Sequence, residues 1–417
     1  MKTTIRLAFV TVFTLGATTA FATNGSNLIA TGAKARAMGG TSIGMSHGAE
    51  SGLSNPALIT KIKGVHEISF GGTIFMPDVK NNQALYLGAQ GDHSGSAQSK
   101  ADMNIIPEVS VVSKISENLY LGMGMWGTAG MGVDYDGGNS AQLNMSTNLQ
   151  LMQFGVPIAY TTSGFSLAVT PVIQYGSLDI NYDLSKELQI AMGNMAATQT
   201  KNIGSGVQQD LAFGFTLGIA YEIENLTIGA IHKSQIDMLY TGVLSGAIQG
   251  FGITNYNNDI LSTPEENGIG VSYKINNHTI ALDYKRINWS DAEGYKDFEW
   301  QDQDVYTLGY EYATDTWALR AGYNYSKCPI EEQKYSGTNS AGLNAGTVNT
   351  FNLLGFPAII ESHYTFGGTY ALNEQVSVDT AIVYTPEATE TFTNFMNQDI
   401  SVKHSQTSIT LGLNYNY

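Results

Sequence analysis

The feature that most limits the fold of this chain is an alternation of bulky and small side chains with a period of two residues. In residues 211–222 the odd positions carry Leu, Phe, Phe, Leu, Ile and Tyr, whereas the even positions carry Ala, Gly, Thr, Gly, Ala and Glu. The same alternation appears in residues 305–312, 317–326 and 407–417. Successive side chains of a β-strand point to opposite faces, so this period indicates strands. The sequence therefore predicts an all-β fold.

The connections between the expected strands fall into two classes of length. Short turns are expected near residues 116–118, 162–164, 224–225, 276–277, 314–315 and 373–374, and long loops near residues 80–102, 136–142, 184–208, 242–262, 288–303, 328–356 and 387–401. Six short turns and seven long loops make thirteen connections and hence fourteen strands. Strict alternation of short and long connections is typical of a transmembrane barrel, in which closure removes every unpaired strand edge.

The composition agrees with a closed barrel better than with an ordinary soluble protein. The chain has 46 Gly and 23 Tyr, but only 13% of its residues are charged. After residue 22 no apolar run is long enough for a helical membrane span. A soluble sandwich would also alternate, but its connections would be short at both ends.

The first 22 residues have the order of a secretory signal peptide. Lys2 and Arg6 precede an apolar stretch over residues 7–17, and Ala20-Phe21-Ala22 forms a cleavage site. We expect the mature chain to start at Thr23. Loss of the two cations changes the net charge from -16 to -18, which excludes a nucleic-acid partner.

Residues 23–63 do not alternate and are rich in Gly, Ala, Ser and Asn. We expect them to form a module ahead of a barrel over residues 64–417. The module either folds back into the barrel as a plug or forms a flexible periplasmic tail, which composition alone favours.

Several motifs of the chain resemble the FadL family of outer-membrane transporters. They are Asn24-Gly25, residues 32–40, Asn55-Pro56-Ala57, Thr263-Pro264-Glu265, Asn288-Trp289-Ser290, residues 304–312, residues 317–323 and Pro329. The resemblance implies a fourteen-stranded antiparallel transmembrane β-barrel with an N-terminal hatch inside the lumen. The residues that it assigns to the hatch are Asn24, Gly25, Met38, Gly39, Gly40, Asn55, Pro56 and Ala57.

The resemblance also implies a transport route. A hydrophobic ligand is captured at the outer loops, passes to a site inside the barrel and leaves sideways through a kinked third strand. The kink corresponds to Gly127, Thr128, Ala129 and Gly130. Gly tolerates the unusual backbone angles of a bulge, although these glycines would also suit an ordinary tightly packed strand.

The sequence is compatible with two classes of ligand, long-chain fatty acids and neutral hydrocarbons. Asn181 and Gln301 align where fatty-acid-specific members of the family carry basic residues. Without those charges a buried carboxylate loses its charge-assisted hydrogen bonds. Neutral aromatic or aliphatic hydrocarbons are therefore expected ligands beside long-chain fatty acids, with Arg286 and Arg320 as substitute contacts for a carboxylate.

Two of the expected extracellular loops carry apolar side chains that we interpret as a capture surface. The residues are Leu188, Met192, Met195, Ile248 and Phe251. Exposed apolar groups often mark binding surfaces, but the same residues would also be needed if the loops pack on each other to cap the barrel.

No catalytic, metal or cofactor site is expected. The chain has no nucleophile signature, and its seven His are not spaced like metal ligands. We expect a monomer in the bacterial outer membrane that takes up hydrophobic molecules passively, contacts lipid and lipopolysaccharide, and is assembled by the insertion machinery. A general porin or surface adhesin is the alternative, and an outer-membrane lipid hydrolase is a more remote one.

Overall fold

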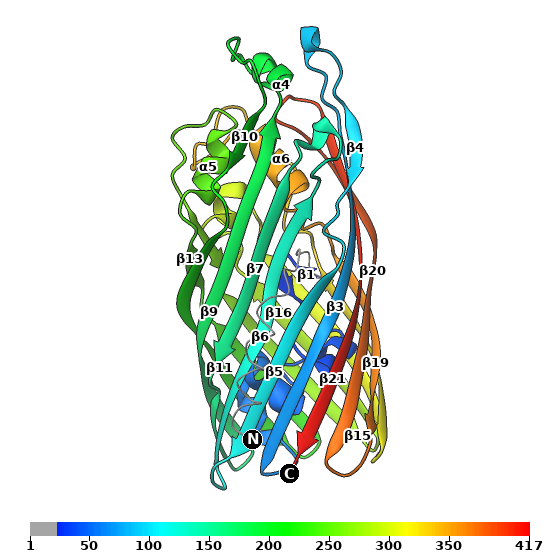
Figure 1. Cartoon of the computed structure of the whole chain (residues 1–417). Helices are drawn as coiled ribbons and strands as arrows, with labels where there is room; N and C mark the ends of the chain where they lie inside the picture. Colours follow the sequence, from blue (N-terminus) through cyan, green and yellow to red (C-terminus); the bar gives the residue numbers. More distant parts are fainter. Residues whose placement is uncertain (1–22) are drawn as a thin grey trace, which may run out of the picture.

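The computed structural model describes residues 23–417, so the expected signal segment lies outside the described residues. Fourteen antiparallel strands form a tall barrel (Figure 1). They are β3 (His66–Gln83), β5 (Asn104–Lys114), β6 (Leu119–Asp134), β7 (Ser146–Gly155) continued by β8 (Ile158–Thr162), β9 (Phe165–Leu184), β11 (Gln208–Ile223), β12 (Leu226–Lys233), β15 (Glu266–Ile275), β16 (His278–Ile287), β17 (Gln303–Ala313), β18 (Trp317–Ser326), β19 (Ser362–Ala371), β20 (Val376–Thr393) and β21 (Asp399–Asn416).

Each strand pairs with the next along the chain, and β21 pairs with β3 to close the sheet. The closing ladder is long and runs from the pair of Ile400 and Gln83 to the pair of Asn416 and Glu67. The predicted fourteen-stranded barrel is confirmed.

The bulky face of each alternating strand points outward. In β11, Leu211 and Phe213 are 61% and 76% exposed, whereas Thr216 and Ala220 on the opposite face are buried. An apolar exterior suits the hydrocarbon layer of a membrane. Among residues 23–417, no helix is both long and apolar enough to cross a membrane.

The six short turns occur where the sequence predicts them, at the end of the barrel that carries the C-terminus (Figure 1). We call this the short-turn end. The long connections gather at the other end, the long-loop end. They contain η4 (Gly88–Gln90), β4 (Gly95–Gln98), η5 (Ser140–Gln142), α4 (Lys186–Ala191), β10 (Lys201–Gly204), β13 (Ile236–Leu239), α5 (Val243–Gln249), β14 (Ile260–Thr263), η6 (Tyr295–Phe298), α6 (Ala345–Thr350) and η7 (Phe351–Gly355).

The prediction of a long loop over residues 387–401 is wrong. β20 continues to Thr393 and β21 begins at Asp399, and the pairing runs through a bulge between Thr385 and Ala388. The prediction failed because charged residues such as Glu387 and Glu390 are typical of loops, although here they belong to a strand. Where a barrel extends beyond the apolar band, its strands can carry charges on the outside.

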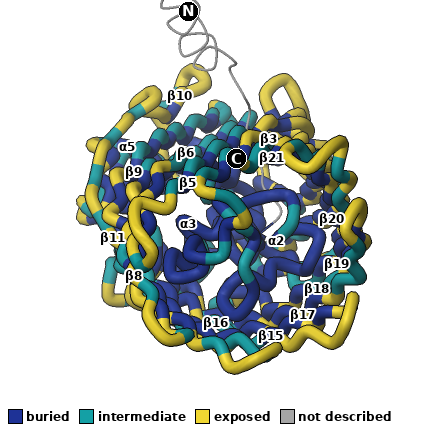
Figure 2. Tube along the Cα trace, turned by 90° about the horizontal axis from the view of Figure 1, so that it is seen from below, coloured by how far each residue is buried: buried dark blue, intermediate teal, exposed yellow. Residues whose placement is uncertain are grey.

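Residues 23–62 lie inside the barrel as β1 (Thr23–Asn24), β2 (Asn27–Leu28), α2 (Ala33–Ala37), η2 (Gly48–Glu50), α3 (Ser51–Ser54) and η3 (Pro56–Lys61). Seen from the short-turn end, α2 and α3 occupy the middle of the ring of strands and are mostly buried (Figure 2). We call residues 23–62 the N-terminal segment. Glycines on the inner wall make room for it, since a side chain at Gly322 would overlap the backbone of Gly39.

Candidate functional site

A cavity of about 70 Å³ lies inside the barrel between the N-terminal segment and the wall. Its lining includes apolar side chains and several polar ones. The apolar group contains Leu28, Ile29, Leu53, Val172, Ile231, Ile236, Pro264 and Val305, and the polar group contains Asn27, Thr128, Gln153, Thr216, Lys233, Thr263, Glu266, Asp283 and Lys285. The free volume is small, so an organic ligand requires the lining side chains to move apart, and the mixed lining suits a ligand with a polar end.

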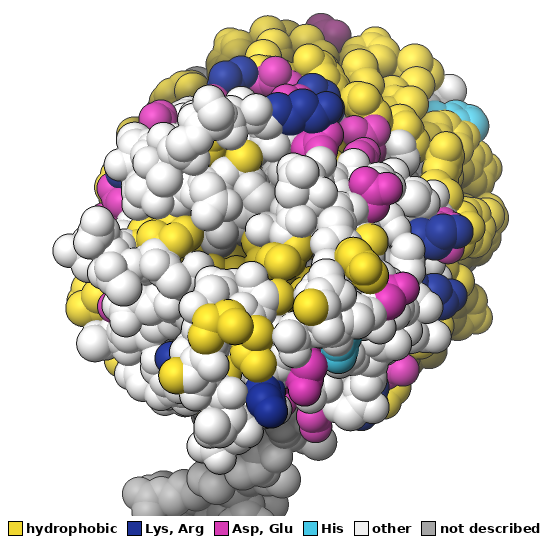
Figure 3. Space-filling view, turned by 90° about the horizontal axis from the view of Figure 1, so that it is seen from above, with side chains coloured by type: hydrophobic (Ala, Val, Ile, Leu, Met, Phe, Trp, Pro, Cys, Tyr) yellow, Lys and Arg dark blue, Asp and Glu magenta, His cyan; other side chains and the backbone are white. Residues whose placement is uncertain are grey.

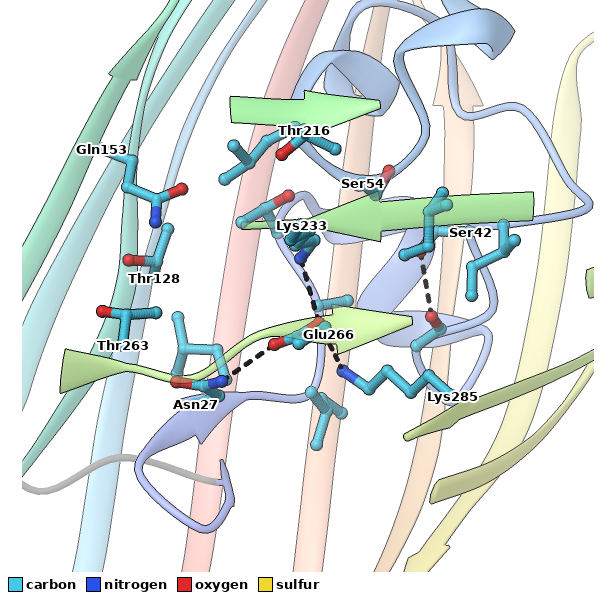
Figure 4. Close-up of a pocket in the computed structure, with 18 of the residues that line it drawn as sticks. Asn27, Ser42, Ser54, Thr128, Gln153, Thr216, Lys233, Thr263, Glu266 and Lys285 are labelled. Carbon is cyan, nitrogen blue, oxygen red and sulfur yellow. Dashed lines mark hydrogen bonds and ion pairs between the residues drawn. The ribbon is translucent and has the colours of Figure 1, made fainter. Parts of the chain in front are cut away.

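Four polar side chains meet at one point of this cavity (Figure 4). Oε2 of Glu266 lies 3.3 Å from Nζ of Lys233 and 3.7 Å from Nζ of Lys285. Oε1 of the same carboxylate accepts a hydrogen bond of 2.8 Å from Nδ2 of Asn27. Two ammonium groups thus share one carboxylate, which leaves a net charge of +1 on the three ionised groups.

The strand register brings these charges together. Lys233 at the end of β12 is the direct partner of Glu266 at the start of β15. Lys285 of β16 is the direct partner of Gly268 of β15. Gly268 follows Glu266 by two residues, so Lys285 lies diagonally across from Glu266 on the inward face.

Asp283 lies on the same face of β16 as Lys285, but it binds the backbone of the N-terminal segment. Its carboxylate accepts hydrogen bonds from the backbone N–H groups of Ser42, Ile43 and Gly44, at 2.6, 2.8 and 3.3 Å. These bonds satisfy the buried charge and fix the middle of the N-terminal segment to the wall.

The glycine-rich part of β6 forms a kink that borders the cavity. The ladder between β5 and β6 ends at the pair of Glu108 and Trp126, whereas β6 stays paired with β7 through a register shift between Gly127 and Ala129. Thr128 in this bulge lines the cavity, and its buried hydroxyl has no hydrogen-bond partner among the described residues.

The N-terminal segment lies along the gap that the kink leaves. Asn27 pairs with Ala129, and the N–H group of Gly130 donates a hydrogen bond of 3.1 Å to the carbonyl of Ser26. Leu28 packs in a buried cluster with Phe75 and Ile106. Residues 26–28 thus fill the gap beside the kink, whereas Thr128 of the kink lines the cavity directly.

The residues predicted for the hatch are all buried in the N-terminal segment. Nδ2 of Asn55 donates to the carbonyl oxygens of Ile43 and Ile219, at 2.8 and 3.1 Å, and its Oδ1 accepts from the N–H group of Ala57, which follows Pro56. Gly25, Gly39 and Gly40 all have positive φ angles of 66°, 70° and 94°. Asn24 accepts a hydrogen bond from Ser326 through Oδ1, and Met38 is fully buried.

Three of the residues predicted for ligand capture are buried within the long loops. Leu188, Ile248 and Phe251 belong to the large hydrophobic cluster that fills the long-loop end, Met192 packs against it and Met195 is 78% exposed. Viewed onto the long loops, the facing surface carries hydrophobic side chains in small groups between polar ones, whereas a continuous hydrophobic surface is visible at the upper and right margins of the view (Figure 3). This arrangement matches the reading in which the loops pack on each other to cap the barrel.

The four residues predicted as polar ligand contacts do not line the central cavity. Asn181 lies on the face of β9 opposite to the buried Ile180 and Tyr182. Gln301 is exposed in a loop, and Arg286 lies on the outside of β16, where it pairs with Asp302 and Asp304. Arg320 is buried nearer the short-turn end and pairs with Glu311 and Asp379.

Sequence reasoning missed Lys233, Glu266 and Lys285. The signal was present, because charged residues are rare in this chain and Lys285 falls on the strand face opposite to the outward Tyr284 and Arg286. Among residues 23–417, no group of three or more His, Cys, Asp or Glu side chains is placed to hold a metal ion.

Comparison with known proteins finds one family. Residues 8–338 match the family described as outer membrane protein transport protein (OMPP1/FadL/TodX). A curated uncharacterized protein of Chlorobium limicola, from the 5' region of a phosphoenolpyruvate carboxykinase gene, is 47% identical over 66 residues, which is 16% of this chain and 32% of that protein. The chain thus matches about a third of the length of this curated relative.

Solved structures of similar fold cover nearly the whole chain. A FadL homologue of Pseudomonas aeruginosa has a TM-score of 0.70 and 15% identity, over 94% of this chain and 99% of that one. The toluene transporter TodX of Pseudomonas putida has a TM-score of 0.68 and 18% identity, over 93% and 99%. The toluene transporter TbuX of Ralstonia pickettii has a TM-score of 0.64 and 16% identity, over 93% and 98%.

Proposed function

This chain belongs to the OMPP1/FadL/TodX family of outer-membrane transport proteins, and we propose that it takes up amphipathic molecules with a long apolar body and an anionic head, such as long-chain fatty acids. The observation that carries the proposal is the pair of ammonium groups of Lys233 and Lys285 beside the apolar lining of the central cavity. A carboxylate between them would gain charge-assisted hydrogen bonds, and the apolar tail would leave water.

The proposed route starts at the long-loop end, which faces the cell exterior. The cluster around Leu188, Ile248 and Phe251 loosens to admit the ligand, which then moves down to the central cavity. The N-terminal segment acts as the hatch that blocks direct passage to the periplasm. The ligand leaves sideways through the gap beside Gly127–Gly130, because exit into hydrocarbon avoids re-exposing its apolar surface to water. Transport is passive, and the protein is not an enzyme.

We further propose that the barrel works as a monomer with its bulky outer face in contact with membrane lipid and lipopolysaccharide. The exposed Leu211, Phe213 and their neighbours on β11 support this environment.

Neutral hydrocarbons are the second candidate ligands. The relatives TodX and TbuX are described as toluene transporters, and more than a third of the residues lining the cavity here are hydrophobic. For such a ligand, Lys233 and Lys285 would contribute nothing to affinity.

One binding experiment separates these two classes. Detergent-purified protein is titrated with oleate, with oleyl alcohol of the same length and with toluene, in the wild type and in Lys233→Gln and Lys285→Gln variants. For an anionic ligand we expect each variant to weaken oleate binding by about tenfold to a hundredfold, because a hydrogen bond to a charged group contributes roughly 1.5–3 kcal/mol. Arg286→Gln is the matched control, since Arg286 is on the same strand but faces outward. Equal affinities of all variants for oleate would contradict the assignment of an anionic head group.

A further inference from the structure

Glu266 links the ligand cavity to the part of the N-terminal segment that fills the gap beside β6. On the cavity side its carboxylate is shared by Lys233 and Lys285, at 3.3 and 3.7 Å. Through its other oxygen it accepts the 2.8 Å hydrogen bond from Asn27 (Figure 4). Glu266 is 5% exposed, so water screens neither set of contacts strongly.

Asn27 is itself part of the closure of the gap. Its backbone pairs with Ala129, and the carbonyl of the preceding Ser26 accepts the N–H group of Gly130. The following residue, Leu28, packs with Ile106, and a side chain at Gly127 would overlap Ile106. Residues 26–28 and Ile106 therefore fill the space where the β5–β6 ladder has ended.

The other contacts of this part of the chain are of a different kind. Ser26 shares a hydrogen bond of 3.0 Å with Tyr295, and Asn24 accepts one of 3.2 Å from Ser326. Both pairs are neutral. Further along, the backbone N–H group of Gly32 donates to Glu108 at 2.7 Å, and Asp283 fixes residues 42–44. Among the side-chain hydrogen bonds of Asn24, Ser26 and Asn27 described here, the bond of Asn27 to Glu266 thus differs in having an ionised partner.

We infer that Glu266 determines specificity for charged ligands by coupling the ligand head group to the release of Asn27 from the gap. The inference rests on the proposed function. An entering carboxylate competes with Glu266 for both ammonium groups and repels it, so Glu266 moves away from them and its bond to Asn27 is lost. A neutral ligand leaves Glu266 in place. Because coupling between two sites is reciprocal, a protein with Asn27 released also binds the anionic ligand more tightly.

Hydrogen exchange at Gly130 measures this coupling directly, because its N–H group is bonded to Ser26 in the closed gap. The detergent-purified full-length protein is labelled with deuterium alone, with saturating oleate and with saturating oleyl alcohol. We expect oleate to raise the exchange rate of the peptide containing Gly130 about fivefold or more, in the range of measured coupling energies. Oleyl alcohol should leave the rate unchanged.

Two variants and one control complete the test. Glu266→Gln keeps an oxygen for Asn27 but removes the charge, so oleate should bind at least as tightly while the exchange response disappears. Asn27→Ala should show fast exchange at Gly130 without any ligand. Arg286→Gln should respond to oleate like the wild type.

The outcomes separate the inference from the function on which it rests. If oleate binds with the dependence on Lys233 and Lys285 described above but does not change exchange at Gly130, the coupling through Glu266 is refuted and the proposed function stands. If the alcohol opens the gap as well as the acid does, the head-group charge is not the trigger. If binding of oleate does not depend on the lysines, both are overturned.

Discussion

The imidazole ring of His66 stacks on the phenol ring of Tyr417, with 4.7 Å between the ring centroids and 30° between the planes. The backbones of the two residues also exchange hydrogen bonds, of 2.8 Å from the N–H group of His66 and 3.0 Å from that of Tyr417. The closing strands β3 and β21 are thus fastened at the short-turn end by one residue on each side.

Loss of this contact should impair assembly of the barrel. We expect deletion of Asn416 and Tyr417 to lower the folded amount severalfold, because the closing ladder loses its last bonds and the terminal aromatic side chain resembles the signal that the outer-membrane insertion machinery reads. The folded fraction is measured from the heat-modifiable band on unboiled gels. Tyr417→Phe, which keeps the ring, should fold normally. An undiminished band after the deletion would contradict the prediction.

Gly39→Ala should displace the N-terminal segment without preventing barrel formation. Gly39 has a φ of 70°, and an added Cβ would lie 2.7 Å from the backbone nitrogen of Tyr323. A non-glycine residue in this conformation costs about 1–3 kcal/mol even before the clash. We expect faster tryptic cleavage after Lys34 and Arg36 in the intact barrel.

The matched control for this variant is Gly88→Ala. Gly88 has a similar φ of 61°, but a Cβ there would meet nothing within 4 Å. Cleavage at Lys34 and Arg36 should therefore stay at the wild-type rate. Cleavage of the Gly39→Ala variant at the same rate as the Gly88→Ala variant would contradict the prediction.

The stability of the folded protein should fall as the pH rises through the neutral range, in part because of Glu50. Burial in the N-terminal segment raises the pKa of this carboxyl from its ordinary value of 4.5 to about 8. Between these two values the folded state holds a proton that the unfolded state has lost, so rising pH favours unfolding. Below pH 4.5 Glu50 is protonated in both the folded and the unfolded state, and above pH 8 its contribution to the loss of stability no longer increases.

Glu50→Gln should remove this part of the pH dependence. We expect the Tm of the variant to exceed that of the wild type at pH 8.5 by several degrees and to differ little at pH 4.5, as measured by circular dichroism in detergent. A Tm difference that is the same at both pH values would exclude Glu50 as the titrating group.

Strand β16 shows most clearly which features of the structure can be predicted from the sequence. The period of two predicts that Lys285 and Arg286 face opposite sides, yet only the fold decides which side is the lumen. Because the strands carry bulky side chains on their outer faces, Tyr284 is expected to face outward and the adjacent Lys285 to face the lumen. The barrel, its strand number and the short turns were predictable because they depend on local periodicity and turn residues. The limits of β20 and β21 were not, because polar side chains are compatible with both strand and loop.

The central cavity depends on contacts that local patterns do not contain. Asn27 and Glu266 are separated by 239 residues, and their bond requires the N-terminal segment to lie inside the closed barrel. The kink at Gly127–Gly130 was placed by family resemblance, and its bulge is present. The pairing of Asn27 with Ala129 had no signal in the sequence, because a single backbone pair imposes no pattern on side chains.

The last prediction concerns the sideways exit. Ala129 is buried, and it pairs with Asn27 on one side and with Leu151 of β7 on the other. Replacing Ala129 and Gly130 with Ile and Val introduces β-branched residues that favour a regular strand and fill the gap beside β5.

Uptake of a hydrophobic substrate should then fall to the level of cells that lack the protein, while surface abundance stays normal because the other strands supply most of the barrel's hydrogen bonds. Uptake of labelled fatty acid by whole cells and surface biotinylation measure the two quantities. Thr380→Ile, at an exposed position of β20, controls for added bulk elsewhere in the wall. If the double variant transports at the wild-type rate, and a cross-link that fixes the N-terminal segment to the wall abolishes transport instead, the ligand passes through the lumen and the sideways route is wrong.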